Sequence, residues 1–136
     1  MTAGQKLNGR TISPGKASGE VLISPEPISF LGGVDPKTGI IIDKANSACG
    51  QSVAGKILVF PRGKGSTVGT YVIFQLKKNG VAPAGIVNVE SEAIVAVGAI
   101  IAGIPMMDRI PADLLKTLKN RMFATMNADE GTLEYE

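Results

Sequence analysis

Histidine is absent from this sequence of 136 residues, and cysteine occurs once, as Cys49. Histidine is the usual general base near neutral pH and the commonest metal ligand, so any proton transfer must use another group. A single cysteine excludes an intrachain disulfide and, without histidine, leaves too few ligands for a zinc site or an iron–sulfur cluster. A phosphohistidine carrier is excluded as well. We therefore expect no cofactor on this chain, and Cys49 receives no role because a lone cysteine is usually inert.

Aromatic residues are also scarce, and the charge is nearly balanced. Tryptophan is absent, aromatic residues make up 4%, and 14 Lys and Arg against 12 Asp and Glu give a net charge of +2. We expect no nucleic-acid partner, because stacking platforms and a basic footprint are both missing. The longest apolar run, 93–105, is too short to span a bilayer, and residues 1–15 lack the apolar core of a signal peptide. We expect a soluble, cytoplasmic protein without membrane contact.

The length and the hydrophobic fraction of 44% predict one domain over residues 1–136. In the first half, β-branched runs predict strands, and turn signals over 30–39 predict a surface loop. From residue 56 onward, strand and helix patterns alternate. The predicted strands are 19–24, 38–43, 56–60, 84–90, 103–107 and an edge strand at 131–136; the predicted helices are 68–80, 91–103 and 111–120. The pattern indicates an α/β fold, with a β-rich N-terminal half joined to a βαβ unit with parallel pairing.

Two of these helices carry further predictions. Ser91 is the expected N-cap of helix 91–103, which is apolar on nearly every side and is therefore expected to be buried. Pro111 is expected to open the surface helix that follows, because proline is favoured in the first turn.

The segment PRGKGST, residues 61–67, leads from a predicted strand into a predicted helix. Backbone N–H groups and the positive end of the helix dipole favour an anion at such a place. Arg62 and Lys64 add cationic donors suited to carboxylate or phosphate, and Gly65 permits close backbone approach. We interpret the loop as a binding site for an anionic ligand.

Neither common nucleotide fingerprint fits this loop. The Walker pattern fails because Gly65 separates Lys64 from Ser66, and the dinucleotide pattern fails because Val68 replaces its third glycine. A plainer interpretation is an ordinary turn, in which Ser66 or Thr67 caps the helix. Solvated surface charges are the corresponding plain interpretation of the two basic side chains.

Several charged residues admit a structural and a functional interpretation. Asp35 and Asp43 are expected to shape turns, with a lesser possibility that either lines a cleft. Asp108 and Arg109 follow a predicted strand end, where α/β sheets often place functional groups. An intrachain ion pair explains these last two equally well.

Four stretches of the sequence together resemble the aconitase X small-subunit family. They are SPGKASGEVLISPEPISFLGGVDPKTGIIID from residue 13, GKILVFPRGKGSTVGTYV from residue 55, PAGIVN from residue 83 and GIPMMD from residue 103. The resemblance covers roughly residues 9–109 and implies a swivelling β/β/α domain similar to that of aconitase. It also implies a heterodimer with a large subunit that binds an iron–sulfur cluster, and it identifies Ser66 as the proton acceptor.

The activity that the resemblance implies is that of a hydro-lyase with a site shared between two chains. The expected reaction dehydrates mevalonate 5-phosphate to trans-anhydromevalonate 5-phosphate in the archaeal-type mevalonate pathway, with Arg62, Lys64 and Gly65 binding the substrate's anionic groups. We expect no activity from this chain alone. The alternatives are a small subunit that serves another hydroxy acid, such as cis-3-hydroxyproline, and a non-catalytic module that binds anions or a partner.

Overall fold

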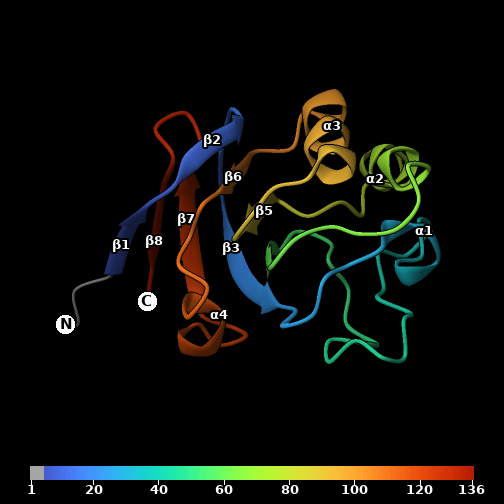
Figure 1. Ribbon diagram of the computed structural model, residues 1–136, viewed down its shortest axis with the longest axis horizontal. Coiled ribbons are helices and arrows are strands. Elements are labelled where there is room, and N and C mark those ends of the chain that lie inside the picture. The colour runs from blue at the N-terminus through green and yellow to red at the C-terminus, as the bar shows by residue number, and fades with distance from the viewer. Residues whose placement is uncertain (1–4) are drawn as a thin grey trace.

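The computed structural model describes residues 5–136; residues 1–4, the start of the segment 1–15 that is predicted not to be a signal peptide, lie outside this range. Its strands form a mixed eight-stranded sheet in the order β1-β8-β7-β3-β4-β5-β6-β2 (Figure 1). The strands are β1 (Gln5–Asn8), β2 (Arg10–Ser13), β3 (Lys16–Ile23), β4 (Ile57–Phe60), β5 (Gly85–Asn88), β6 (Met106–Asp108), β7 (Phe123–Asn127) and β8 (Thr132–Tyr135). The helices are α1 (Phe30–Gly33), α2 (Gly69–Lys78), α3 (Ala93–Ala102) and α4 (Leu114–Thr117).

Strand β3 joins the two halves of the sheet. Its first five residues pair antiparallel with β7, and its last three pair parallel with β4. The parallel pairing continues through β5 and β6, and the antiparallel pairing through β8 and β1. The βαβ unit expected from the sequence is thus confirmed, and its parallel sheet extends from β3 to β6.

The two ends of the sheet are joined by a single segment. Strands β1 and β2 are separated only by Gly9, and they pair with β8 and β6 at opposite ends of the strand order. Figure 1 shows β1 and β2 following one another along one ribbon. A Cβ on Gly9 would lie 2.3 Å from the carbonyl oxygen of Asp108, so only glycine fits at this corner. Within residues 5–136 the sheet therefore closes on itself, which leaves no long exposed edge there.

Two apolar cores lie on opposite faces of the parallel strands. Alternate residues of β4 and β5 contribute to each core, as a strand's period of two requires. One core contains Leu58, Phe60 and Ile86 together with residues of α2 and α3. The other contains Ile57, Val59 and Val87 together with residues of α4, β7 and β8. Burial on both faces explains why these strands are continuous apolar runs in the sequence.

Most predicted elements are present, but five predictions about them were wrong; the fifth concerns the N-cap of helix 91–103, which is Glu92 instead of Ser91. Residues 38–43 form only isolated bridges at Ile40 and Ile41, because turns on both sides fold this segment back. The strand at the C-terminus is β8, which lies between β1 and β7 instead of at an edge. The helix expected from Pro111 is the single turn α4, because the backbone is already extended at the buried Leu118.

The fourth correction concerns α3. Its exposed side chains include Val97, Ile100 and Ile101, which are 44%, 56% and 57% accessible. Only one face of α3 packs closely on α2, where Gly98 meets Ile73 at a distance that leaves no room for a Cβ. An apolar composition on every side therefore did not make the helix buried. In the part of the chain that the structure describes, no helix is long and apolar enough to cross a membrane.

Candidate functional site

The carboxyl ends of the four parallel strands β3 to β6 lie at one edge of the sheet. The connections that leave these ends are 24–29, 61–68, 89–92 and 109–113. This edge is the common place for ligands in α/β sheets. The topology therefore brings the PRGKGST loop together with residues from three other parts of the sequence.

Backbone hydrogen bonds hold the first half of the PRGKGST loop. The N–H groups of Val89 and Glu90 both donate to the carbonyl oxygen of Pro61, each at 3.1 Å. Ile28 donates to the carbonyl of Arg62 at 3.2 Å and accepts from Lys64 N–H at 3.0 Å. The connections after β3 and β5 thus fix where the loop begins.

Close contacts explain both glycines of the loop. Gly65 has φ = +92°, and a Cβ there would lie 2.3 Å from Ser29 Oγ. A Cβ on Gly63 would lie 2.4 Å from Glu92 Oε1. Ser29 and Glu92, neither of which was a predicted site residue, therefore flank the loop at van der Waals distance.

Ser66 is exposed, and its Oγ accepts a hydrogen bond from Val68 N–H at 3.1 Å. The N-cap of α2 is Val68, so neither Ser66 nor Thr67 caps the helix and the plainer interpretation was wrong in this respect. The carbonyls of these two residues instead accept from Gly69 and Thr70, in a tight turn that leads into α2. An N–H directed at the Ser66 oxygen favours negative charge there.

The second half of the loop presents free backbone donors. Among the described residues, Gly65, Ser66 and Thr67 have no hydrogen-bond partner for their N–H groups. They precede α2, a helix of ten residues whose dipole favours an anion at this end. Arg62 and Lys64 are exposed, and neither forms an ion pair within residues 5–136. The fold thus brings the four predicted site residues together on one open loop, and their contact with a ligand stays a prediction.

Asn88 lies beside this loop and was missed by the sequence analysis. It is fully buried at the end of β5, and its Nδ2 donates to the carbonyl oxygens of Phe60 at 3.0 Å and Val87 at 3.2 Å. Its Oδ1 is buried and has no hydrogen-bond partner among the described residues. An amide that ends an otherwise apolar run, GIVN, was the signal in the sequence.

Asp108 closes the sheet and takes no part in the open loop. Its carboxylate accepts from Arg10 Nε at 3.0 Å and Nη2 at 2.8 Å, and from Ser91 N–H at 3.1 Å. Burial alone raises the pKa of Asp108, but the hydrogen bonds from Arg10 and Ser91 outweigh it and the pKa is lowered. The intrachain ion pair considered for this residue exists, with Arg10 as its partner. Arg109 is exposed, has φ = 62° and lies outside that pair.

The other candidates have simple structural roles. Asp35 Oδ1 accepts from Lys37 N–H and Asp43 Oδ1 from Ala45 N–H, each at 2.9 Å, so both shape turns as expected. Cys49 is exposed and free. Within residues 5–136, no three His, Cys, Asp or Glu side chains gather in a way that could hold a metal ion, so this chain's residues do not fit a cluster.

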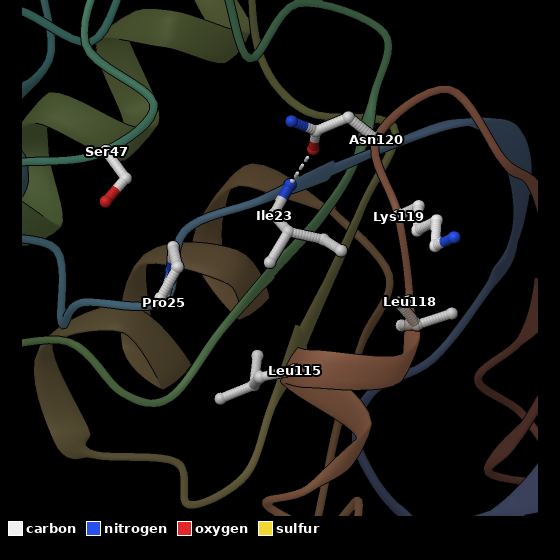
Figure 2. Close-up of a pocket in the computed structure, with 7 residues that line it drawn as sticks. All are labelled: Ile23, Pro25, Ser47, Leu115, Leu118, Lys119 and Asn120. Carbon is white, nitrogen blue, oxygen red and sulfur yellow. Dashed lines mark hydrogen bonds between the residues drawn. The ribbon is translucent and has the colours of Figure 1, made fainter.

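The surface has several hollows apart from the predicted site residues, and two of them lie beside α4 and α2. The larger, about 330 Å³, lies at the end of β3 against α4, and Figure 2 shows Ile23 N–H directed at Asn120 Oδ1 within it. Its lining is Ile23, Pro25, Ser47, Leu115, Leu118, Lys119 and Asn120. The smaller, about 220 Å³, is apolar and lined by Thr70, Tyr71, Phe74 and Ile101. Ser66 is exposed and lines neither hollow, so it lies on an open surface of the described chain.

A mixed sheet whose parallel strands pack against α2 and α3 on one face defines the α/β class of fold. The chain belongs to the aconitase X swivel domain family, which matches residues 6–135. The resemblance stated from the sequence is therefore confirmed.

Similar proteins support both the family and the fold. The phosphomevalonate dehydratase small subunit of Methanosarcina acetivorans is 57% identical over 129 residues, covering 95% of this chain and 90% of that protein. The protein of the same name from Thermococcus gammatolerans is 59% identical over 129 residues, covering 95% and 96%. The crystal structure of Thermococcus kodakaraensis aconitase X (holo-form) matches with a TM-score of 0.93 and 56% identity, covering 98% of this chain and 99% of that one. The solution NMR structure of a UPF0107 protein matches with a TM-score of 0.89 and 48% identity, covering 97% and 99%. The predicted swivelling α/β fold is confirmed.

Proposed function

We propose that this chain is the small subunit of a hydro-lyase that dehydrates mevalonate 5-phosphate to trans-anhydromevalonate 5-phosphate in the archaeal-type mevalonate pathway. Relatives at 57% and 59% identity, aligned over nearly the whole chain, are named phosphomevalonate dehydratase small subunit. The family and the arrangement of the PRGKGST loop agree with this activity.

The observation that carries the chemistry is the hydrogen bond from Val68 N–H to Ser66 Oγ at 3.1 Å. A serine hydroxyl is a poor base unless its alkoxide is stabilised, and here a backbone donor and the start of α2 both favour negative oxygen. Ser66 accepts the proton from the carbon next to the substrate carboxylate. The electrons of that C–H bond form the double bond, and the hydroxyl leaves the neighbouring carbon, so that water is lost overall.

The anionic groups of the substrate bind on the same loop. Mevalonate 5-phosphate carries a carboxylate and a phosphate, and the free N–H groups of Gly65, Ser66 and Thr67 are donors suited to one of them. Arg62 and Lys64 are exposed beside these donors and add charge-assisted hydrogen bonds. The orientation that these contacts impose brings the reacting carbon to Ser66.

A large subunit completes the site. The relatives are named small subunits. Ser66 is exposed, so another chain must exclude water from it before its oxygen can act as the base. With one cysteine and no histidine, this chain lacks the ligands of an iron–sulfur cluster, so we place that cluster on the large subunit. Turnover therefore needs the heterodimer.

The first test is Ser66→Ala in a complex co-expressed with the large subunit and purified without oxygen. We expect dehydration of mevalonate 5-phosphate to fall by about 100-fold or more, because a positioned base contributes that much, while the complex still assembles. Ser18→Ala, on an exposed face of β3 in the antiparallel half, is the matched control and keeps wild-type turnover.

Each contrary outcome corrects a different part of the proposal. Full activity in the Ser66→Ala complex would move the base to another residue. An assembled wild-type complex that ignores mevalonate 5-phosphate would reject the substrate, and other hydroxy acids such as cis-3-hydroxyproline would be assayed next. A chain that binds anions and assembles with no partner would favour the non-catalytic module.

A further inference from the structure

Asn88 lies where the PRGKGST loop leaves the sheet. It pairs in register with Phe60, the last residue of β4, and Pro61 follows directly. Its Nδ2 donates to the Phe60 carbonyl at 3.0 Å. The N–H groups of the next two residues, Val89 and Glu90, donate to the Pro61 carbonyl. Three consecutive residues at the end of β5 therefore hold the two carbonyls from which the loop starts.

Packing alone does not account for an amide at this position. Asn88 is 0% exposed, and its Oδ1 has no hydrogen-bond partner among the described residues. An unpaired buried acceptor is destabilising, and an apolar side chain of similar size would avoid that penalty. Its neighbours Ile86 and Val87 are apolar and equally buried. The unpaired Oδ1 is therefore accompanied by two hydrogen bonds from Nδ2, to the carbonyls of Val87 and Phe60, and only the bond to Phe60 reaches another strand.

The hydrogen bond acts on the part of the loop that carries the site residues. Asn88 orients the Phe60–Pro61 peptide, and the bonds of Arg62 and Lys64 to Ile28 continue that constraint along the chain. Beyond Lys64 the backbone donors are free, so the direction in which they point depends on the fixed first half. Small displacements of such groups are costly to catalysis.

We infer that Asn88 is a positioning residue for the PRGKGST loop, acting through the Phe60 carbonyl and not by contact with the substrate. The catalytic consequence rests on the proposed function of Ser66. The structural consequence, the orientation of residues 62–67, does not depend on that function and is measured separately.

The structural test uses two variants with buried amides removed. Asn88→Leu deletes the bond to Phe60. Asn46→Leu is the control, since Asn46 is also buried and bonds to Ser24 Oγ and Ala48 N–H, each at 2.8 Å, and makes no hydrogen bond to residues 60–67. In ¹⁵N spectra of the isolated chain, we expect the amide signals of residues 62–67 to shift in Asn88→Leu and to keep their positions in Asn46→Leu.

The catalytic test uses the assembled complex. Asn88→Leu should lower kcat at least tenfold with a smaller change in KM. Asn46→Leu should lower thermal stability and leave kcat unchanged. In Asn88→Asp a protonated carboxyl can still donate one hydrogen bond to the Phe60 carbonyl, and burial without a cationic partner favours that form. This variant should therefore keep the loop signals nearer their wild-type positions and retain more kcat than Asn88→Leu, because leucine has no donor.

The outcomes separate this inference from the proposed function. Loop signals that stay in place in Asn88→Leu overturn the inference, whatever the turnover. Shifted loop signals with unchanged turnover support the positioning role and overturn its catalytic consequence, whereas only full activity in the Ser66→Ala complex overturns Ser66 as the base. Should Asn88→Leu fail to fold, Asn88→Ala takes its place in both tests, and loop signals that stay in place in that variant overturn the inference.

Discussion

Gly65 and Gly50 have the same backbone torsion, φ = +92°, in different surroundings. A Cβ on Gly50 would meet nothing within 4 Å, whereas on Gly65 it would lie 2.3 Å from Ser29 Oγ. Comparing these two glycines therefore separates two effects that an added Cβ would have on stability. Strain from the left-handed torsion applies to both, and displacement of a neighbour applies only in the PRGKGST loop.

Alanine at each position makes that separation measurable. Both variants should lose about 1–2 kcal/mol of unfolding free energy, because a Cβ is disfavoured in the left-handed region. Only Gly65→Ala forces the Ser29 hydroxyl to give up its 3.1 Å bond to the Leu31 carbonyl, so only this variant should lower turnover of the complex. Urea denaturation and the dehydration assay test the two parts, and equal turnover in both variants would contradict the close-approach explanation.

Helix α3 illustrates how one side chain serves two elements. Glu92, and not Ser91, is its N-cap, and the carboxylate accepts from Ile94 N–H at 3.0 Å and Val95 N–H at 2.8 Å. The same side chain lies against Gly63 of the PRGKGST loop. A carboxylate suits the positive end of the helix better than the expected serine hydroxyl, and it satisfies two donors at once.

Removing this cap should weaken α3 selectively. Glu92→Ala is expected to lower the unfolding free energy by about 1 kcal/mol, the usual cost of losing an N-cap. Glu90→Ala is the control, because Glu90 is exposed and its side chain makes no hydrogen bond among the described residues; its change should stay within about 0.5 kcal/mol. Chemical denaturation of both variants in one buffer tests this, and equal stabilities would show that Glu92 is not an effective cap.

For the whole molecule, the Arg10–Asp108 pair closes the sheet between residues 98 positions apart in the sequence. The hydrogen bonds to Asp108 lower its pKa in spite of burial. A carboxyl group whose pKa is lowered by folding stabilises the protein above its unfolded pKa of about 3.9, and this contribution is lost as the pH falls through the folded value. Closure of the sheet should therefore weaken in acid.

The variant Asp108→Asn tests this dependence. At pH 7 it should be less stable than wild type by about 1–3 kcal/mol, because a charged acceptor of three hydrogen bonds is replaced by a neutral one. The difference should shrink below about pH 4, where wild-type Asp108 also begins to lose its charge. Asp113→Asn, at an exposed position without a side-chain cap, is the control and should match wild type throughout. A difference that does not vary with pH would rule out the charge as its source.

Local patterns in the sequence were sufficient for part of this protein. The apolar runs of β4 and β5 and the helix at 68–80 were predictable because each is long enough to carry its own periodicity and end signals. The PRGKGST loop was found for the same reason, since strand, glycines, basic residues and helix are adjacent along the chain. Ser66 as the base stays a prediction, which the complex will test.

The sequence by itself determined the class of fold, the family and the loop, because these depend on neighbouring residues and on recognisable stretches. Only the tertiary structure decided the positions of β1, β2 and β7, the interior place of β8, and the partners of Asn88 and Asp108. The strands that the sequence did not predict, β1, β2 and β7, are short and lack strong apolar runs. They are stabilised by pairing with distant strands and not by local preference. Contacts between residues far apart in the chain exist only once the sheet has closed, and the positioning of the loop depends on them.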